Sequence, residues 1–206
     1  MAVTAYAKAR ERGSEALRRA LLDTASRLLV KEGPQALTMR RVAAAAGCST
    51  TVLYTTFGGK HGLADGLYRE AFARFAKRLA AVPSDTDPLT RLIALGEAYR
   101  DNARENPTYY GVMFGGAMPG FVPSEEALVQ AAATLQALID QVQVCMDAGI
   151  LVPGDPQVVA EVLWAATHGA VSLELAGFFP DEQTAHERFR TLTTGAGLMF
   201  VKGAGA

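Results

Sequence analysis

The chain has 206 residues, half of them apolar, and a formal net charge of −1. This length is enough to bury a core as one large domain or two small ones. The sequence has no run of about 18 uncharged apolar residues and no apolar secretory signal at its N-terminus, so we expect a cytoplasmic protein that does not bind a membrane.

Charge is unevenly distributed along the chain. Residues 1–80 contain 14 Lys and Arg against 6 Asp and Glu, a net charge of +8. Residues 81–206 contain 6 against 15, a net charge of −9. A basic segment joined to an acidic one suggests two domains, of which the basic one suits a polyanion. Surface charge distributed by chance is the alternative.

Helical periodicity dominates the first 80 residues. Apolar residues from Leu17 to Leu28 predict a first helix that starts near Ser14 and ends at Gly33-Pro34. Capping and glycine signals predict two short helices after it, followed by a fourth helix; their expected ranges are 38–46, 49–57 and 60–81.

The polar stretch 83–88 predicts a domain boundary. Beyond it we expect helices near residues 88–105, 107–116, 124–148, 156–177 and 183–202. No strand-like alternation bounded by hairpin turns occurs. The predicted fold is all-α with about nine helices. Its predicted parts are a basic domain at 1–60 with an arm at 1–13, a connecting helix at 61–82, and an acidic domain at 83–206.

The second and third predicted helices flank a tight turn. Small and apolar residues such as Ala43 and Leu53 supply contacts between them, and Gly47 takes the left-handed conformation of the turn without steric cost. A helix-turn-helix is built in this way, with its second helix in the major groove of DNA. An ordinary helical corner capped by Ser and Thr has the same pattern.

The exposed positions of the third helix carry mainly hydroxyls, which donate to phosphate oxygens or base edges. Lys60 adds a charge at a helix N-terminus that already favours an anion. Thr38 and Arg40 are placed for similar contacts. The candidate DNA-binding residues are Thr38, Arg40, Ser49, Thr50, Thr51, Tyr54, Thr55 and Lys60.

The segment LTMRRVAAAAGCSTTVLYTTFGGKHGL, residues 37–63, resembles the DNA-binding signature of TetR-family transcriptional regulators. The matching residues are Thr38, Ala43, Gly47, Ser49, Leu53, Tyr54, Phe57, Lys60 and Leu63. The resemblance implies that the candidate residues above contact double-stranded DNA.

The chain departs from that family pattern at Thr50, at Thr55 and at Gly58-Gly59, so the family does not give the base preference. The departure at Thr50 removes a phosphate-binding cation and gives more weight to other cations, namely Arg10, Arg12 and Arg41. A basic arm with Arg10 and Arg12 would either enter a minor groove or form a disordered tail.

The last two predicted helices are unusually apolar. Residues 158–175 are apolar on nearly every face, which is typical of a helix buried in a core or against a partner. Small residues such as Gly169 and Gly195 allow close approach of another helix. We interpret the helices near 156–177 and 183–202 as a homodimer interface, consistent with the four-helix packing of the family; a monomeric core is the alternative. Two recognition helices would then read a near-palindromic operator.

Aromatic residues and methionines concentrate in residues 106–121, and Trp164 and His168 share one helical face. The stretch WAATHGAVSLEL resembles the Trp-x-x-x-His-Gly segment of one branch of the TetR family. The family resemblance implies a pocket for a small apolar or amphipathic ligand. The candidate ligand-binding residues are Tyr110, Met113, Phe114, Met118, Phe121, Trp164 and His168. Plain core packing is the alternative for each.

No catalytic pattern accompanies these segments. The three histidines and two cysteines lack metal-ligand spacing, and no GxSxG or P-loop is present. We expect no enzyme activity, no metal and no cofactor. The predicted function is a ligand-responsive transcriptional repressor. An activator of the same architecture, or a helical small-molecule-binding protein that does not bind DNA, is the alternative.

Overall fold

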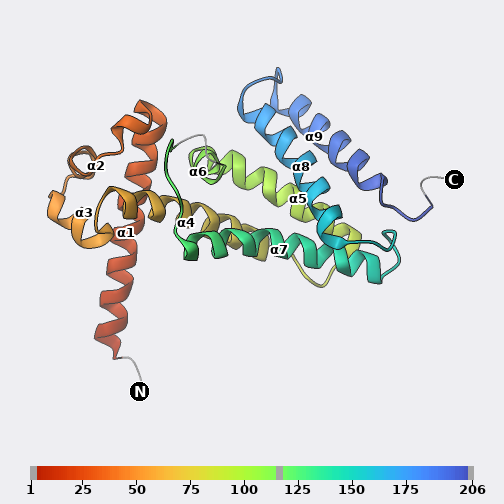
Figure 1. Ribbon diagram of the computed structural model, residues 1–206, viewed down its shortest axis with the longest axis horizontal. Coiled ribbons are helices and arrows are strands. Elements are labelled where there is room, and N and C mark those ends of the chain that lie inside the picture. Colours follow the sequence, from red (N-terminus) through yellow and green to blue (C-terminus); the bar gives the residue numbers. More distant parts are fainter. Residues whose placement is uncertain (1–3, 115–117, 204–206) are drawn as a thin grey trace. The chain divides into compact units, whose positions relative to one another are not determined.

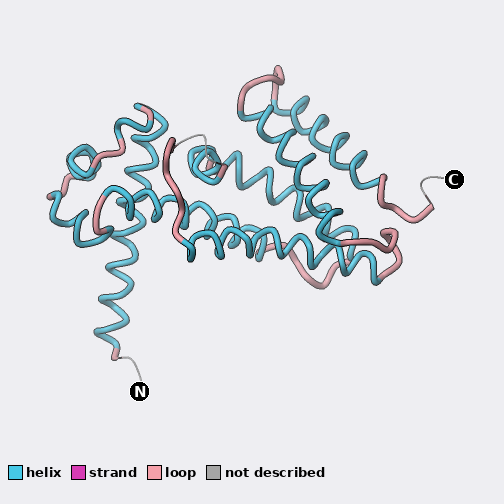
Figure 2. Tube along the Cα trace, viewed as in Figure 1, coloured by secondary structure: helices cyan, strands magenta, loops and turns pink. Residues whose placement is uncertain are grey.

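The computed structural model describes residues 4–114 and 118–203 (Figure 1). In this part of the chain the helices are α1 (Ala5–Glu32), η1 (Pro34–Ala36), α2 (Met39–Ala46), α3 (Thr50–Phe57), α4 (Lys60–Ala80), α5 (Pro88–Glu105), α6 (Pro107–Met113), α7 (Glu125–Asp147), α8 (Pro156–Leu175) and α9 (Glu182–Leu198). An isolated antiparallel bridge joins Leu151 to Val201, and the described residues form no strand (Figure 2). The predicted all-α class with about nine helices is confirmed.

The N-terminal helix is longer than predicted. It begins at Ala5 because Thr4 caps it, the Thr4 hydroxyl accepting a hydrogen bond from the Ala7 N–H at 3.3 Å. The following residues are rich in Ala, Arg and Lys, which are strong helix formers. The prediction of a start near Ser14 is therefore wrong. Residues 5–13 continue the helix instead of forming an extended arm or a tail.

The first of two compact units comprises Met1–Phe72 and Thr108–Leu128. Its core is built around Leu22, Leu53, Leu63 and Leu67, all with 0% exposure. Gly66 brings α4 close to its neighbours, since a Cβ at this position would lie 3.2 Å from side-chain atoms of α1 and of α3. Leucines from several helices thus fix the short α3 in place.

The second compact unit comprises Ala73–Pro107 and Val129–Ala206. In it α8 packs against α9 and α5. One buried cluster joins α7, α8 and the loop between them, through Val142, Cys145, Met146, Leu151, Val159 and Ala160. The compact units are defined by contacts within the chain, whereas the predicted boundaries at residues 60 and 82 separate functions. Those boundaries therefore stay a prediction.

One helix of the described residues, α8, is long and apolar enough to cross a membrane by length and composition. Only 28% of the residues in its most apolar stretch are buried inside the chain. Core helices of soluble proteins can pass the same test, and a single such helix does not identify a membrane protein. The expectation of no membrane contact stays a prediction.

Candidate nucleic-acid interface

The corner between α2 and α3 follows from three local signals. Thr38 caps α2 by accepting a hydrogen bond from the Arg41 N–H at 3.3 Å. Gly47 ends α2 in the left-handed conformation, with φ of 68°, and the Cys48 N–H then donates to the Ala43 carbonyl at 3.0 Å. A left-handed glycine with a backbone bond across the last turn is the usual way to end a helix abruptly. The chain can therefore start α3 only three residues later.

Apolar contacts hold the two short helices together as predicted. Val42 and Leu53 are fully buried and Ala43 is 3% exposed. At the end of α3, the Arg18 guanidinium of α1 lies over the Phe57 ring, 5.7 Å from its centroid. These contacts leave the opposite side of α3 in solvent.

The exposed side of α3 carries the predicted hydroxyls. Thr50, Thr51, Tyr54 and Thr55 are spaced i, i+1, i+4 and i+5, which places them on one face of a helix. All four are exposed, and their hydroxyls make no hydrogen bond to the described part of the chain. Thr56 differs, because its hydroxyl donates to the Val52 carbonyl at 2.8 Å.

Ser49 precedes this face and is exposed. It stands at the N-cap position of α3, yet its hydroxyl makes no capping hydrogen bond. A Ser at an N-cap normally bonds an N–H of the first turn. The Val52 N–H donates to the Ser49 carbonyl at 3.1 Å. The Ser49 hydroxyl and the N–H groups of Thr50 and Thr51 are therefore available to an acceptor such as a phosphate oxygen.

The cations near the corner between α2 and α3 differ in whether they form ion pairs. Arg40 on α2 and Lys60 at the start of α4 are exposed and form no ion pair within the described residues. Arg41 instead forms an ion pair with Glu32. Arg41 is thus partly neutralised, which weakens the expectation that it compensates for Thr50.

A glycine sets the junction of α3 and α4. Gly58 ends α3 in the left-handed conformation, with φ of 72°. In the first turn of α4, a Cβ on Gly62 would overlap the carbonyl oxygen of Phe57. That oxygen belongs to the backbone and cannot move without moving α3. Gly62 therefore fixes how closely α4 follows the helix that carries the hydroxyl face.

The candidate ligand-binding residues fall in different units. Tyr110, Met113 and Met118 are buried in the first unit, and the Tyr110 and Phe114 rings pack with their centroids 5.0 Å apart. Phe121 lies 5.6 Å from the His61 ring and 6.0 Å from the Tyr68 ring, both of α4. Of the helix predicted for 107–116, α6 accounts for residues through Met113, and residues 115–117 lie outside the described part.

Trp164 and His168 belong to the second unit, where their ring centroids are 5.9 Å apart. His168 Nδ1 shares a hydrogen bond of 2.9 Å with the Tyr99 hydroxyl, and Nε2 lies 3.4 Å from Ser172 Oγ. Burial lowers the pKa of His168 below its ordinary value. The candidate ligand residues are thus divided between the two units, and a single pocket lined by all seven stays a prediction.

Sequence reasoning missed several residues of these clusters. Tyr99 is 69 positions away from His168, and no periodicity connects them. Asp65 of α4 accepts hydrogen bonds from the N–H of Ser124 at 2.8 Å and from its hydroxyl at 3.1 Å. In the sequence, Asp65 interrupts the mostly apolar stretch at residues 62–67, and that was the signal available.

Comparison with known proteins bears on both units. The profile of "Bacterial regulatory proteins, tetR family" matches residues 21–67, and that of "Tetracyclin repressor-like, C-terminal domain" matches residues 92–195. The HTH-type transcriptional regulator Rv1816 of Mycobacterium tuberculosis is 24% identical, over 76% of this chain and 80% of that protein.

Solved structures agree with the same fold. The regulatory protein SCO4313 matches with a TM-score of 0.74 and 26% identity, over 90% of this chain and 97% of that one. AibR, in a crystal with isovaleryl coenzyme A and operator DNA, matches with a TM-score of 0.68 and 20% identity, over 87% of this chain and 97% of that one.

The all-helical fold and the exposed α3 corner define a helix-turn-helix transcriptional regulator. The chain belongs to the TetR family, as its two matching profiles show. The family is one of regulators and not of enzymes, in agreement with the prediction from sequence.

Proposed function

We propose that this chain is a homodimeric repressor that binds a near-palindromic operator through α3 and releases it when a small apolar or amphipathic molecule binds. The protein would act in the cytoplasm, where its DNA lies. The observation that carries the DNA-binding part is the row of exposed hydroxyls on α3, which have no hydrogen-bond partner in residues 4–114 and 118–203. A helix face with such donors, held by a rigid corner, fits base edges and phosphates in a major groove.

Two features of α8 and α9 support a homodimer. Large apolar side chains are exposed on both helices, namely Val158 at 53%, Leu173 at 46%, Leu192 at 47% and Leu198 at 53%. A Cβ on Gly169 of α8 would meet no atom within 4 Å. Packing inside the chain does not require this glycine, which costs about 1 kcal/mol of helix propensity relative to Ala. It does leave room for another helix to approach.

A second copy is the partner that best fits this surface, since a two-fold dimer places the same apolar patch on both sides. It would also present two α3 helices to successive major grooves, about 34 Å apart. Analytical ultracentrifugation tests this step: Gly169→Arg should turn a dimer into a monomer. A wild-type chain that sediments as a monomer at micromolar concentration would contradict it.

The ligand part of the proposal is supported by the two aromatic clusters. The AibR crystal contains an acyl coenzyme A together with operator DNA, so one protein of this fold binds both. For this chain we propose an amphipathic ligand of that kind. Trp164 is the only tryptophan, and its fluorescence reports on the cluster around His168. A titration with isovaleryl coenzyme A should change this fluorescence if the ligand binds near α8.

Release of DNA requires that the ligand favour a state unable to bind the operator. Moving the population from 1:99 to 99:1 takes about 5.5 kcal/mol of differential binding. The helix α4 would carry the change, because it starts directly after α3 and continues as one helix into the second unit. A ligand that binds equally well to free and DNA-bound protein would contradict this mechanism.

Selection of bound duplexes from a random-sequence library tests DNA binding directly. On the selected duplex, Lys60→Ala and Tyr54→Phe should weaken binding to all sequences, because their contacts are with phosphates. Thr51→Ala and Thr55→Ala should instead change the preferred bases. Lys31→Ala, on the far end of α1, is the control and should bind like wild type. If Lys60→Ala also binds like wild type at physiological salt, this contact map is wrong.

Two other functions give different results. An activator would bind the same duplex, but deletion of its gene would lower the expression of a reporter instead of raising it. A helical protein that binds small molecules but not DNA would select no duplex from the library and would not be retained on heparin.

A further inference from the structure

The N-terminal part of α1 packs against no other helix among the described residues. Every residue from 4 to 14 is exposed, including Tyr6 at 77%. In Figure 1 this stretch of α1 extends beyond α2 and α3 of the same unit to the N-terminus. The buried residues of α1 begin only at Leu21. We call residues 4–14 the extension.

The extension has charge but no apolar stripe. It contains Lys8, Arg10 and Arg12 against one acidic residue, Glu11. None of the three cations forms an ion pair with the described part of the chain. An amphipathic helix usually persists because it packs an apolar face. Its apolar residues are only Tyr6 and three alanines, which form no continuous stripe, so its charged surface suits an anionic partner.

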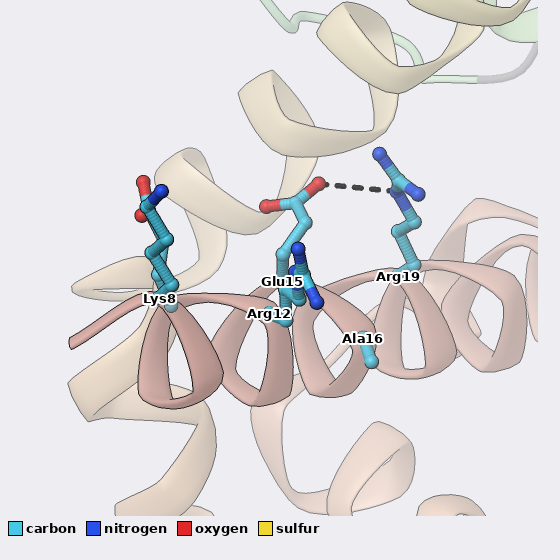
Figure 3. Close-up of a pocket in the computed structure, with 6 residues that line it drawn as sticks. Lys8, Arg12, Glu15, Ala16 and Arg19 are labelled. Carbon is cyan, nitrogen blue, oxygen red and sulfur yellow. Dashed lines mark ion pairs between the residues drawn. The ribbon is translucent and has the colours of Figure 1, made fainter. Parts of the chain in front are cut away.

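Charged residues follow one side of α1 from the extension to the part of the helix that packs against the core. Lys8, Arg12 and Arg19 are spaced i, i+4 and i+11, and they line a shallow open hollow of about 320 Å³ together with Ala16, Glu11 and Glu15 (Figure 3). Glu15 is already paired with Arg19, at 3.1 Å. Of the other charged residues on this side, Lys8, Arg12 and Glu11 form no ion pair within the described residues, which leaves a net positive charge.

The extension is rigidly connected to the recognition corner within one unit. Arg18 of α1 lies over Phe57, the last residue of α3. From Arg18 to Ala5 the helix continues for about 20 Å, at 1.5 Å per residue. When α3 occupies a major groove, the extension is therefore held at a fixed position relative to that groove.

We propose that Lys8 and Arg12 bind backbone phosphates of the DNA beyond the groove that α3 occupies. This inference rests on the proposed function. The partner is duplex DNA because the charged side is continuous with the helix that supports α3, and because phosphates present a regular row of anions to a straight helix. The contacts come from the Lys8 and Arg12 side chains and not from the N–H groups at the start of α1, because Thr4 already caps that end. A rigid helix binds from outside the duplex and does not thread into a minor groove.

Salt dependence of DNA binding tests the proposal. The probe is the duplex that wild-type protein selects from a random library, with ten base pairs added on each side. Lys8→Ala/Arg12→Ala keeps the helix, because Ala is the best helix former. We expect affinity about tenfold weaker or more, and a slope of log K against log salt shallower by about 0.9 for each phosphate that the variant no longer neutralises. The control Lys31→Ala/Lys77→Ala removes the same charge from exposed positions elsewhere and should match wild type.

Gly13→Ala separates a helix from a flexible arm. A Cβ on Gly13 meets no atom within 4 Å, so this change only stiffens the helix. It should bind the probe as tightly as wild type or more tightly. Weaker binding by Gly13→Ala would show that the extension must unfold to reach DNA and would overturn the rigid-helix proposal.

Three other outcomes would overturn the proposed phosphate contacts. If the double variant matches wild type in affinity and slope, the extension does not contact DNA, although the proposed function stands. If the double variant changes the preferred bases, Lys8 and Arg12 read bases and not phosphates. If wild type selects no duplex and binds none at low salt, the proposed function fails first, and this inference fails with it.

Discussion

In the first compact unit, α3 turns hydroxyls toward solvent, whereas in the second unit α8 and α9 turn valines and leucines outward. Both surfaces are helical, and both belong to well-packed units. The difference lies in what each helix leaves uncovered. Hydroxyls without partners fit a polar, hydrogen-bonding surface such as DNA, and uncovered leucines fit another apolar surface.

The two units are also held together differently. Around α3, glycines and a threonine cap determine where the short helices end and begin, and buried leucines hold α3 against its neighbours. In the second unit, Arg100 is 3% exposed and binds Glu174 through two hydrogen bonds of 2.8 Å and 2.6 Å. The recognition corner thus depends on backbone geometry, and the second unit depends in part on a buried charge pair. Substitutions in each unit test this contrast.

The largest effect is expected at the buried pair. Arg100→Ala leaves Glu174 buried with Arg104 at 3.3 Å as its nearest cation, and should lower the free energy of unfolding by about 3–5 kcal/mol. Urea denaturation measures this. Arg78→Ala, which breaks half-exposed pairs with Asp101 and Glu105, is the control and should cost less than about 1 kcal/mol. Equal costs would contradict the role assigned to burial.

The next effect concerns the junction of α3 and α4. Gly62→Ala forces a methyl group onto the Phe57 carbonyl and should cost about 1–3 kcal/mol, as overpacking does. Gly13→Ala places the same methyl group on a helix in open space and should stabilise by about 1 kcal/mol or less. Thermal unfolding of both variants gives the comparison. A neutral Gly62→Ala would show that the corner adapts and does not depend on close approach.

A smaller effect distinguishes two caps of the recognition corner. Thr38→Ala removes a capping hydrogen bond and should cost about 1 kcal/mol of stability. Ser49→Ala removes a hydroxyl that makes no such bond, so its unfolding free energy should stay near that of wild type while its DNA affinity falls. If Ser49→Ala proves as destabilising as Thr38→Ala, the Ser49 hydroxyl serves the fold and is not kept for DNA.

The smallest effect is a pH dependence in the second unit. Burial lowers the pKa of His168, so as pH falls below the ordinary histidine pKa of about 6.5 the unfolded chain takes up a proton that the folded chain resists. Stability from this group is therefore complete above that pH and declines below it. Melting temperatures from pH 7.5 to 5 should fall less for His168→Gln than for wild type. Parallel curves would show that His168 does not contribute.

Sequence alone predicted the recognition corner well because its signals are local. Thr38, Gly47 and Gly58 each act within a few residues, and the structure places α2 and α3 within one residue of the expected ranges. The start of α1 was missed because Thr4 caps a helix that has no apolar periodicity in its first turns. A capping signal without amphipathicity is easily passed over.

The ligand clusters were predicted less completely, for a physical reason. Trp164 and His168 share a helical face, which periodicity reveals. Tyr99, which bonds His168, comes from another helix, and only tertiary packing brings the two together. The candidate ligand residues from 110 to 168 are divided between the two compact units, so the pocket they would line together stays a prediction.

The central claim is that the hydroxyl face of α3 reads base pairs, once in each subunit of a dimer. Sequencing the duplexes that wild type and Thr51→Val select from one random library tests it most directly, because Val keeps the shape of Thr and removes the hydroxyl. We expect a palindromic motif for wild type, altered in the variant at one symmetric pair of positions. A motif without two-fold symmetry, or one left unchanged by Thr51→Val, would contradict the account.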